Sequence, residues 1–460
     1  MERHVCERPL MKVTPTVKFP SNWLRFHEEF LPAWVKSSFS PRETWKNKPF
    51  TREDSIFFGK GIVELSELFT ESRPARLPAY FRHERFRSAY LLYFLPLQAS
   101  KFVALFQEKG FILSHALKAA RERPEGTLRV LDLGAGPGTA SIALFLSLLD
   151  RPTELPKNLR FEWWDTQEPI LKNGKQLLED WLDRDPRWKG RVEIVIRTGS
   201  WQEGARRTDQ HDLILMGNVM NETPVRTDTR KTRDRPFSMI EAEESLPTRE
   251  EKPSHPEQAE IELLRSKAGA GGLLIVEPAL HRTAQGLSQL RDVIAGQSSD
   301  EKVLPWFGPC LHAGRCPMAR GRDWCHFSIP VEIPGRWFLS FSIRLGSQRQ
   351  WLKYSYLWLR GTDQRKAIPA EPPIAKDARL VITDSLRRKD SDLAMVLLCE
   401  PDRTRRLTLS ARDRIGRGDV IHLKEFERQE ELTRAARPPA AGRDFHEPIR
   451  RGPASRKKKH

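Results

Sequence analysis

The spacing of hydrophobic and polar positions changes along the chain, and the first part is typical of helices. In residues 19–121, apolar side chains recur at helical spacing between proline breaks, as in residues 89–97 and 102–106. Proline interrupts helices, so these breaks separate one predicted helix from the next. We therefore expect a helical N-terminal domain over residues 1–120.

From residue 128 onward, short apolar runs alternate with helical stretches. The runs cover residues 128–133, 159–164, 192–196, 212–216 and 273–276. Five short apolar strands joined by crossover helices are typical of a parallel sheet covered by helices. This pattern predicts an α/β domain with a Rossmann-like sheet over residues 121–360.

The C-terminal part shows a third pattern. Aromatic and β-branched residues alternate with basic ones in residues 337–344 and 353–360, and strand-like runs follow at residues 379–383, 394–399 and 407–409. We expect a small β-rich module over residues 361–433.

Two segments have little hydrophobic pattern. Residues 223–258 are rich in charge, Thr, Pro and Ser, and residues 434–460 carry nine Lys or Arg against two acids. Such compositions do not build a core, so we expect a charged insertion and a disordered basic tail.

The charge balance narrows the class of partner. The chain has 78 Lys and Arg against 61 Asp and Glu, a formal charge of +17, which favours RNA, DNA or an anionic membrane as partner. No run approaches the roughly 18 apolar residues of a membrane span, so we expect no membrane span. The first ten residues include acids and lack an apolar signal region, which favours a cytoplasmic location.

The first predicted strand leads into a glycine-rich turn that holds Gly134, Gly136 and Gly138. Such a turn, followed by a helix, lets backbone N–H groups approach a ligand closely. Asp132 precedes the turn, and its carboxylate would repel a phosphate but attract the cationic methionine end of S-adenosylmethionine. The turn therefore predicts S-adenosylmethionine as the ligand.

Polar residues at the ends of the other strands complete the predicted site. Asp165 ends the second strand, where a carboxylate accepts hydrogen bonds from ribose hydroxyls, although it would also suit the N-cap of a helix starting near residue 168. Ser200 follows the third strand and is a candidate to flank adenine. The candidate catalytic residues follow the fourth strand and are Asn218, Asn221 and Glu222.

Three cysteines crowd into the loop of residues 309–327: Cys310, Cys316 and Cys325. In a reducing compartment this crowding favours a metal over a disulfide. Cys399 is a candidate fourth ligand, with His312 and His326 as competitors. Four sulfurs suit either structural zinc or an iron-sulfur cluster, and buried free thiols are the third interpretation.

Several of these motifs together resemble one family. They are the glycine turn of residues 131–138, Asn-x-x-Asn-Glu at residues 218–222, the cysteine segment, and Lys-Tyr-Ser-Tyr-Leu at residues 353–357. In combination they are similar to the Rsm22 family of methyltransferase-like proteins associated with the small ribosomal subunit, over roughly residues 75–425.

The resemblance implies a class I methyltransferase domain, association with the small ribosomal subunit or its rRNA, and a [4Fe-4S] cluster, with structural zinc as the alternative. Carried over residue by residue, the cluster ligands are Cys310, Cys316, Cys325 and Cys399. The charged insertion and the basic tail are not part of the family pattern.

The expected function is therefore an S-adenosylmethionine-binding, iron-sulfur-containing rRNA methyltransferase, monomeric off the ribosome. The alternative is a non-catalytic assembly factor that retains S-adenosylmethionine binding, because the fourth strand end lacks the Asn/Asp-Pro-Pro-aromatic motif and no nucleophilic cysteine lies near it. The charge excess disfavours a small-molecule methyltransferase.

Overall fold

The computed structural model describes most of the chain outside its termini and one long internal segment. The described residues are 19–46, 48–70, 80–222, 257–297, 304–320, 323–330, 336–346, 351–362, 377–384, 386–387, 393–410 and 415–424. Cys6, the predicted basic tail and nearly all of the predicted charged insertion lie outside the described residues.

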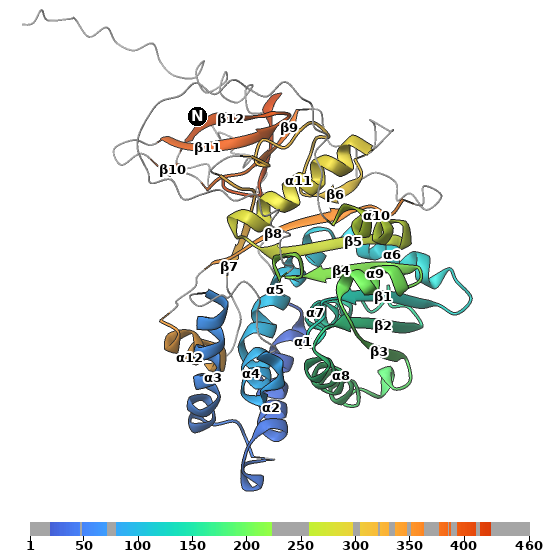
Figure 1. Cartoon of the computed structure of the whole chain (residues 1–460), viewed down its shortest axis with the longest axis vertical. Helices are drawn as coiled ribbons and strands as arrows, with labels where there is room; N and C mark the ends of the chain where they lie inside the picture. The colour runs from blue at the N-terminus through green and yellow to red at the C-terminus, as the bar shows by residue number, and fades with distance from the viewer. Residues whose placement is uncertain are drawn as a thin grey trace, which may run out of the picture.

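The main sheet has the strand order β3-β2-β1-β4-β5-β8-β6, and β7 pairs with β8 (Figure 1). Its strands are β1 (Thr127–Leu133), β2 (Asn158–Asp165), β3 (Val192–Thr198), β4 (His211–Gly217), β5 (Ala268–Pro278), β6 (Trp306–Gly308), β7 (Phe327–Pro330) and β8 (Trp351–Leu359).

The five predicted strands are confirmed as β1 to β5, and they pair in parallel. The sheet is nevertheless mixed, because β8 runs antiparallel to β5 and β6 and β7 run antiparallel to β8. The parallel strand order reverses direction between β1 and β4, which is where open α/β sheets bind ligands.

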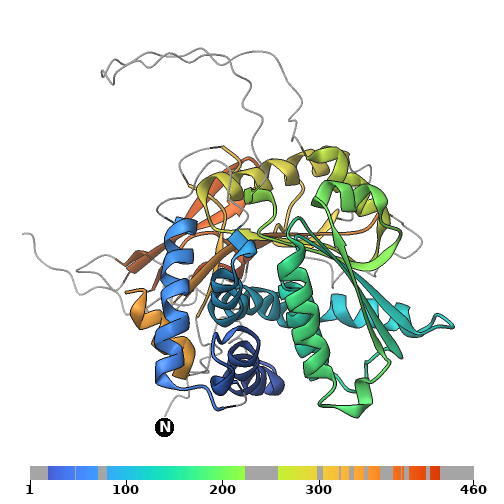
Figure 2. The same cartoon turned by 60° about the horizontal axis from the view of Figure 1, so that its bottom comes forward.

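Helices cover both faces of this sheet (Figure 2). One face packs against α5 (Leu95–Glu108), α6 (Gly110–Arg121), α7 (Thr139–Leu148) and α8 (Glu168–Leu182), and the other against α9 (Trp201–Arg207), α10 (Gln258–Lys267) and α11 (His281–Gln297). Successive residues of β4 alternate between these cores, since Leu213 and Leu215 belong to the first and Ile214 and Met216 to the second. The sheet is therefore covered by helices on both faces, which confirms the predicted Rossmann-like α/β class.

The predicted N-terminal helices are present, and they share their core with the first face of the sheet. They comprise α1 (Ser21–Leu24), η1 (Arg25–Phe30), α2 (Leu31–Phe39), η2 (Glu43–Trp45), α3 (Arg52–Thr70), η3 (Tyr80–Arg82), α4 (Glu84–Ala89) and η4 (Tyr90–Phe94). Phe26 and Phe30 pack on Trp181 of α8, with ring centroids 5.3 and 5.1 Å away.

We expected no segment long enough to span a membrane, but the structure contains one long apolar helical run, Glu84–Glu108. By length and composition it would suffice, but 89% of its apolar window is buried inside the protein. Its apolar side chains therefore contribute to the core.

A second, antiparallel sheet follows, with the order β10-β11-β9-β13 and with β12 paired to β11. Its strands are β9 (Ala378–Val381), β10 (Leu386–Arg387), β11 (Leu393–Glu400), β12 (Arg403–Ser410) and β13 (Val420–His422). The predicted β-rich C-terminal part is thus confirmed.

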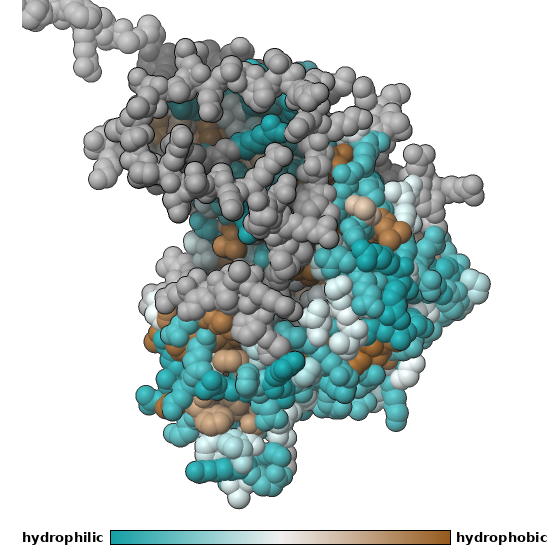
Figure 3. Space-filling view, in the orientation of Figure 1, coloured by the Kyte–Doolittle hydropathy of each residue, from teal (hydrophilic) through white to brown (hydrophobic). Residues whose placement is uncertain are grey.

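The expectation of extended structure at residues 337–344 is wrong, because this segment forms helix α12 (Arg336–Arg344). Trp337 packs on Phe50, Phe338 stacks on Tyr93 at 4.8 Å, and Phe341 is buried. The opposite side of α12 leaves Leu339 and Ile343 exposed, and Figure 3 shows apolar surface over α3 and α12. An aromatic helix face therefore produced the alternation mistaken for a strand.

Candidate functional site

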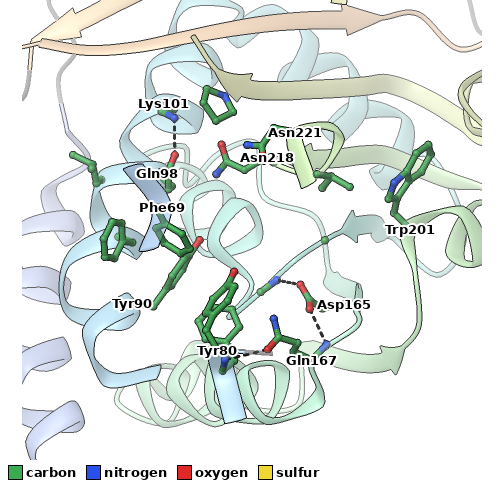
Figure 4. Close-up of a pocket in the computed structure, with 18 of the residues that line it drawn as sticks. Phe69, Tyr80, Tyr90, Gln98, Lys101, Asp165, Gln167, Trp201, Asn218 and Asn221 are labelled. Carbon is green, nitrogen blue, oxygen red and sulfur yellow. Dashed lines mark hydrogen bonds between the residues drawn. The ribbon is translucent and has the colours of Figure 1, made fainter. Parts of the chain in front are cut away.

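A cavity of about 740 Å³ lies over the ends of β1, β2 and β4, at the reversal of the strand order (Figure 4). Of the predicted site residues, Gly134, Gly136, Asp165, Ser200, Asn218 and Asn221 line it. Asp132, Gly138 and Glu222 do not.

The three glycines of the turn all have positive φ, which favours residues without a Cβ. A Cβ on Gly134 would overlap Val219, and one on Gly138 would overlap Trp163. A Cβ on Gly136 would meet nothing within 4 Å. Gly134 and Gly138 are therefore required by packing, whereas Gly136 leaves room for a ligand against its backbone.

Asp132 lies behind the turn instead of on the cavity, which corrects the predicted contact with the methionine end of the ligand. Its Oδ2 accepts hydrogen bonds from the backbone N (3.1 Å) and Oγ (2.8 Å) of Ser141, the third residue of α7. Ser141 Oγ in turn accepts one from Trp163 Nε1. Because it bonds Ser141 in two ways, the Asp132 carboxyl fixes the start of α7. Burial raises the pKa of Asp132 to about 7.

Asp165 connects the turn to the end of β2. Its Oδ2 accepts a hydrogen bond from Gly136 N, and its Oδ1 accepts one from Gln167 N, both at 2.9 Å. Burial raises its pKa, while these backbone N–H groups act in the opposite direction. The N-cap of α8 is Gln167, so Asp165 does not cap that helix and instead holds the turn at the cavity wall.

The end of β3 places Ser200 and Trp201 at the cavity. Ser200 is the N-cap of α9, and its Oγ accepts a hydrogen bond from Glu203 N at 3.2 Å. Trp163 and Trp164 of β2 are buried core residues.

The residues after β4 form a loop that a buried acid holds in place. Glu277, at the end of β5, is fully buried and accepts hydrogen bonds from the backbone N of Val219 (2.8 Å), Met220 (2.9 Å) and Asn221 (3.2 Å). Glu277 is not among the predicted site residues, although an acid near the end of an otherwise apolar strand is a detectable signal.

Asn218 begins this loop in an unusual conformation. Its φ is +59°, and its backbone N donates to Val276 O at 2.9 Å. Within the described part of the chain, its Oδ1 is buried without a hydrogen-bond partner. An unsatisfied hydrogen-bond acceptor therefore lies on a residue that lines the cavity.

One wall of the cavity comes from the N-terminal helices, whose residues are not among the predicted site residues. Aromatic residues of this wall are Phe69, Tyr80, Phe81, Tyr90 and Phe94. Lys101 of α5 is nearly fully buried, and its Nζ donates to Gln98 Oε1 at 2.6 Å. No local motif marks these residues, because only the packing of the helices on the sheet brings them to the cavity.

The four predicted metal ligands line a second, small cavity of about 30 Å³: Cys310, Cys316, Cys325 and Cys399. The first three come from the loop after β6, and Cys399 comes from β11 of the second sheet. Burial raises the pKa of all four thiols, that of Cys310 to about 11. The fold therefore brings together four cysteines that lie up to 89 positions apart in the sequence.

The surroundings hold the cysteine loop from several sides. Arg291 of α11 is buried, pairs with Asp292 at 2.6 Å, and donates to the backbone O of His312 and Gly314. Asp292 accepts hydrogen bonds from Cys316 N at 2.9 and 3.1 Å.

The two competing histidines differ in position. Neither lines the small cavity, but His312 Nε2 lies 3.3 Å from Cys399 Sγ. Among the described residues, no three His, Cys, Asp or Glu side chains are arranged to hold a single metal ion.

The strand order and the cavity at its reversal define the class I methyltransferase fold. Within that class, residues 255–428 match the family Rsm22, described as mitochondrial small ribosomal subunit Rsm22. This match confirms the resemblance predicted from the sequence. It covers β5 and the four cysteines but not the glycine turn.

The chain is also similar to solved methyltransferase structures. A class I S-adenosylmethionine-dependent methyltransferase described as putative, from Listeria monocytogenes, is 10% identical, with 76% of this chain and 91% of that chain covered and a TM-score of 0.30. An RNA methyltransferase described as putative, from Pyrococcus horikoshii, is 12% identical, with coverages of 66% and 99% and a TM-score of 0.27.

The plantazolicin methyltransferase BpumL, in complex with a monoazolic desmethylPZN analog and SAH, is 10% identical, with coverages of 67% and 98% and a TM-score of 0.25. Because these TM-scores are low, the assignment of the fold rests on the strand order itself. No curated protein sequence matches the chain.

Proposed function

We propose that this protein binds S-adenosylmethionine in the large cavity and methylates the rRNA of the small ribosomal subunit. The observation that carries the proposal is the joint placement of Gly136 and Asp165. The glycine leaves space above its backbone, and the acid that holds it lies at the end of β2, where a carboxylate suits ribose hydroxyls.

The residues after β4 support transfer of the methyl group to a polar atom of the substrate. Methyl transfer from a sulfonium depends mainly on holding donor and acceptor in line, so positioning groups can suffice. Asn218 and Asn221 supply amide groups beside the glycine turn. The formal charge of +17 supports a polyanionic substrate such as rRNA.

A second candidate function is an assembly factor that binds the cofactor without catalysis. The observation that favours it is the absence of Glu222, one of the three candidate catalytic residues, from the cavity lining. In this reading, cofactor binding stabilises the folded protein while it is on the subunit.

Mapping of small-subunit rRNA methylation separates the two functions. Cells that lack the gene are complemented with the wild type or with Asp165→Ala. Loss of one modified nucleotide in the deletion and in Asp165→Ala supports the enzyme. Unchanged modification together with immature subunits supports the assembly factor and contradicts catalysis.

We further propose that the four cysteines hold a [4Fe-4S] cluster. All four donors are sulfur and surround one small buried cavity, which suits a soft iron-sulfur group. A structural zinc, which takes Cys ligands at about 2.3 Å, is the alternative occupant. The cluster would connect the second sheet, through Cys399, to the loop after β6.

Anaerobic purification tests the cluster. The wild type should be brown, with about four iron per chain, and Cys399→Ser should lose the colour. Cys6→Ser is the matched control and should keep it. A colourless wild type with one zinc would contradict the cluster, and loss of colour in Cys6→Ser alone would contradict the choice of ligands.

A further inference from the structure

The part of the cavity remote from Trp201 has a wall of aromatic rings (Figure 4). Neighbouring rings are in contact, with centroids 5.3 Å apart for Phe69 and Tyr80, 4.3 Å for Tyr80 and Phe81, and 5.1 Å for Phe81 and Tyr90. Tyr90 also stacks on Phe94. Tyr80, Phe81 and Phe94 are buried, whereas Phe69 and Tyr90 are partly exposed, so these two rings are the apolar surfaces that the wall offers to a planar ligand.

A polar edge lies beside this wall. Lys101 and Gln98 lie together on α5, and Asn218 lies across from them on the loop after β4. The cavity therefore combines stacking faces with a small number of polar groups, as sites for planar polar ligands do.

Asn218 is unfavourable for the folded protein in two respects. A φ of +59° is uncommon for residues other than glycine, and a buried oxygen without a partner destabilises the fold. A glycine would avoid both penalties. Strain retained at a cavity is typical of a functional residue, and the atom left unsatisfied is a hydrogen-bond acceptor.

We propose that the aromatic part of the cavity binds an unstacked nucleobase with an exocyclic amino group, whose N–H donates to Asn218 Oδ1. The proposal rests on the proposed function, because the base and the methyl donor share one cavity. Cytosine and adenine carry the required amino group, whereas uracil has a carbonyl at that position. Single-stranded RNA presents such bases at the smallest cost in unstacking.

The test measures binding of oligoribonucleotides to SAH-loaded protein by fluorescence anisotropy. Oligo(C) and oligo(U) of equal length have equal phosphate charge. The ratio of their binding affinities therefore reports the contribution of the base alone. We expect the wild type to bind oligo(C) about tenfold tighter than oligo(U), the size of one well-placed hydrogen bond. Tyr90→Leu should weaken oligo(C) binding by about tenfold or more through lost stacking.

Asn218→Gly is the decisive variant, since it removes the acceptor and relieves the positive φ. It should unfold at the same or a higher temperature than the wild type and lose the preference for oligo(C). Asp402→Gly is the matched control, because Asp402 also has a positive φ of 64° but lies between β11 and β12 and does not line the cavity. It should keep the preference.

The outcomes separate this proposal from the proposed function. Equal binding of oligo(C) and oligo(U) by wild-type protein that binds SAH would contradict the base site alone. A preference that survives in Asn218→Gly would contradict the role of Asn218. Failure of the wild type to bind SAH would instead contradict the proposed function, and the oligonucleotide ratio measured on ligand-free protein would still test the base site.

Discussion

Asp132 has a pKa that burial raises from 3.8 to about 7, and this shift affects stability. Because the folded protein holds the proton more tightly than the unfolded chain does, the unfolding free energy should fall as the pH rises from about 4 to 7. A shift of this size corresponds to about 4 kcal/mol.

Asp132→Asn isolates this contribution, since the amide has the same shape and does not titrate. The difference in unfolding free energy between variant and wild type, measured in urea, should grow in favour of the variant from pH 4 to pH 7. If the difference in unfolding free energy stays constant over this pH range, Asp132 does not cause the pH dependence of stability.

Individual residues also show what the sequence can predict. Gly136 and Asp165 were found because a turn between strand and helix and an acid at a strand end are local signals. Asp132 was misplaced, because sequence cannot tell which side of a turn a carboxylate occupies. Glu277 was missed, because its partners lie 56 to 58 residues earlier in the chain.

At the scale of elements, α2 and the start of α3 are joined by a buried ion pair. Lys36 Nζ lies 2.5 Å from Asp54 Oδ2, and both side chains are almost fully buried. Asp54 also accepts hydrogen bonds from Thr51 N at 2.7 Å and Thr51 Oγ1 at 3.0 Å. The pair therefore fixes how the two helices meet.

Asp54→Ala should lower the unfolding free energy by about 3–5 kcal/mol, because it leaves the Lys36 ammonium buried and unpaired. Glu43→Ala is the matched control, since the pair of Glu43 with Lys46 is exposed on the Glu43 side, and it should change stability by less than about 1 kcal/mol. Equal effects of the two substitutions in thermal or urea unfolding would contradict this account.

Helices and strands were predicted correctly where hydrophobic positions recur at a clear spacing, and incorrectly where aromatic residues cluster. The strands β1 to β5 are apolar runs between turns, so their positions were predicted. Helix α12 was predicted as extended because Trp337, Phe338 and Phe341 are typical of strands by residue type. The packing of Trp337 on Phe50 and of Phe338 on Tyr93, both far away in the sequence, decides in favour of a helix.

At the scale of the whole molecule, the positive charge predicts a strong salt dependence of RNA binding. Each phosphate contact releases counterions, so log affinity should fall linearly with log salt, with a slope of about −0.7 per contact for single strands. Filter binding of small-subunit rRNA fragments between low and physiological salt measures this slope. A flat response would contradict an RNA-binding role for the basic excess.

The overall assembly could be predicted only in part. The crowding of Cys310, Cys316 and Cys325 is visible in the sequence, but the approach of Cys399 depends on how β11 meets the cysteine loop. The aromatic wall of the cavity likewise depends on helices from residues 52–108 packing against the sheet. Contacts of this range are set by the tertiary fold, so local patterns do not contain them.

Binding of S-adenosylmethionine is the central claim, and calorimetric titration of Gly136→Val tests it most directly. The valine side chain would enter the open space over Gly136, so binding should be abolished. Gly190→Val is the matched control, because Gly190 has a similar positive φ of 72° and equally open surroundings outside the cavity.

The account predicts that wild type and Gly190→Val bind one S-adenosylmethionine per chain and that Gly136→Val binds none. Absence of binding to the wild type, or equal binding by all three proteins, would contradict it.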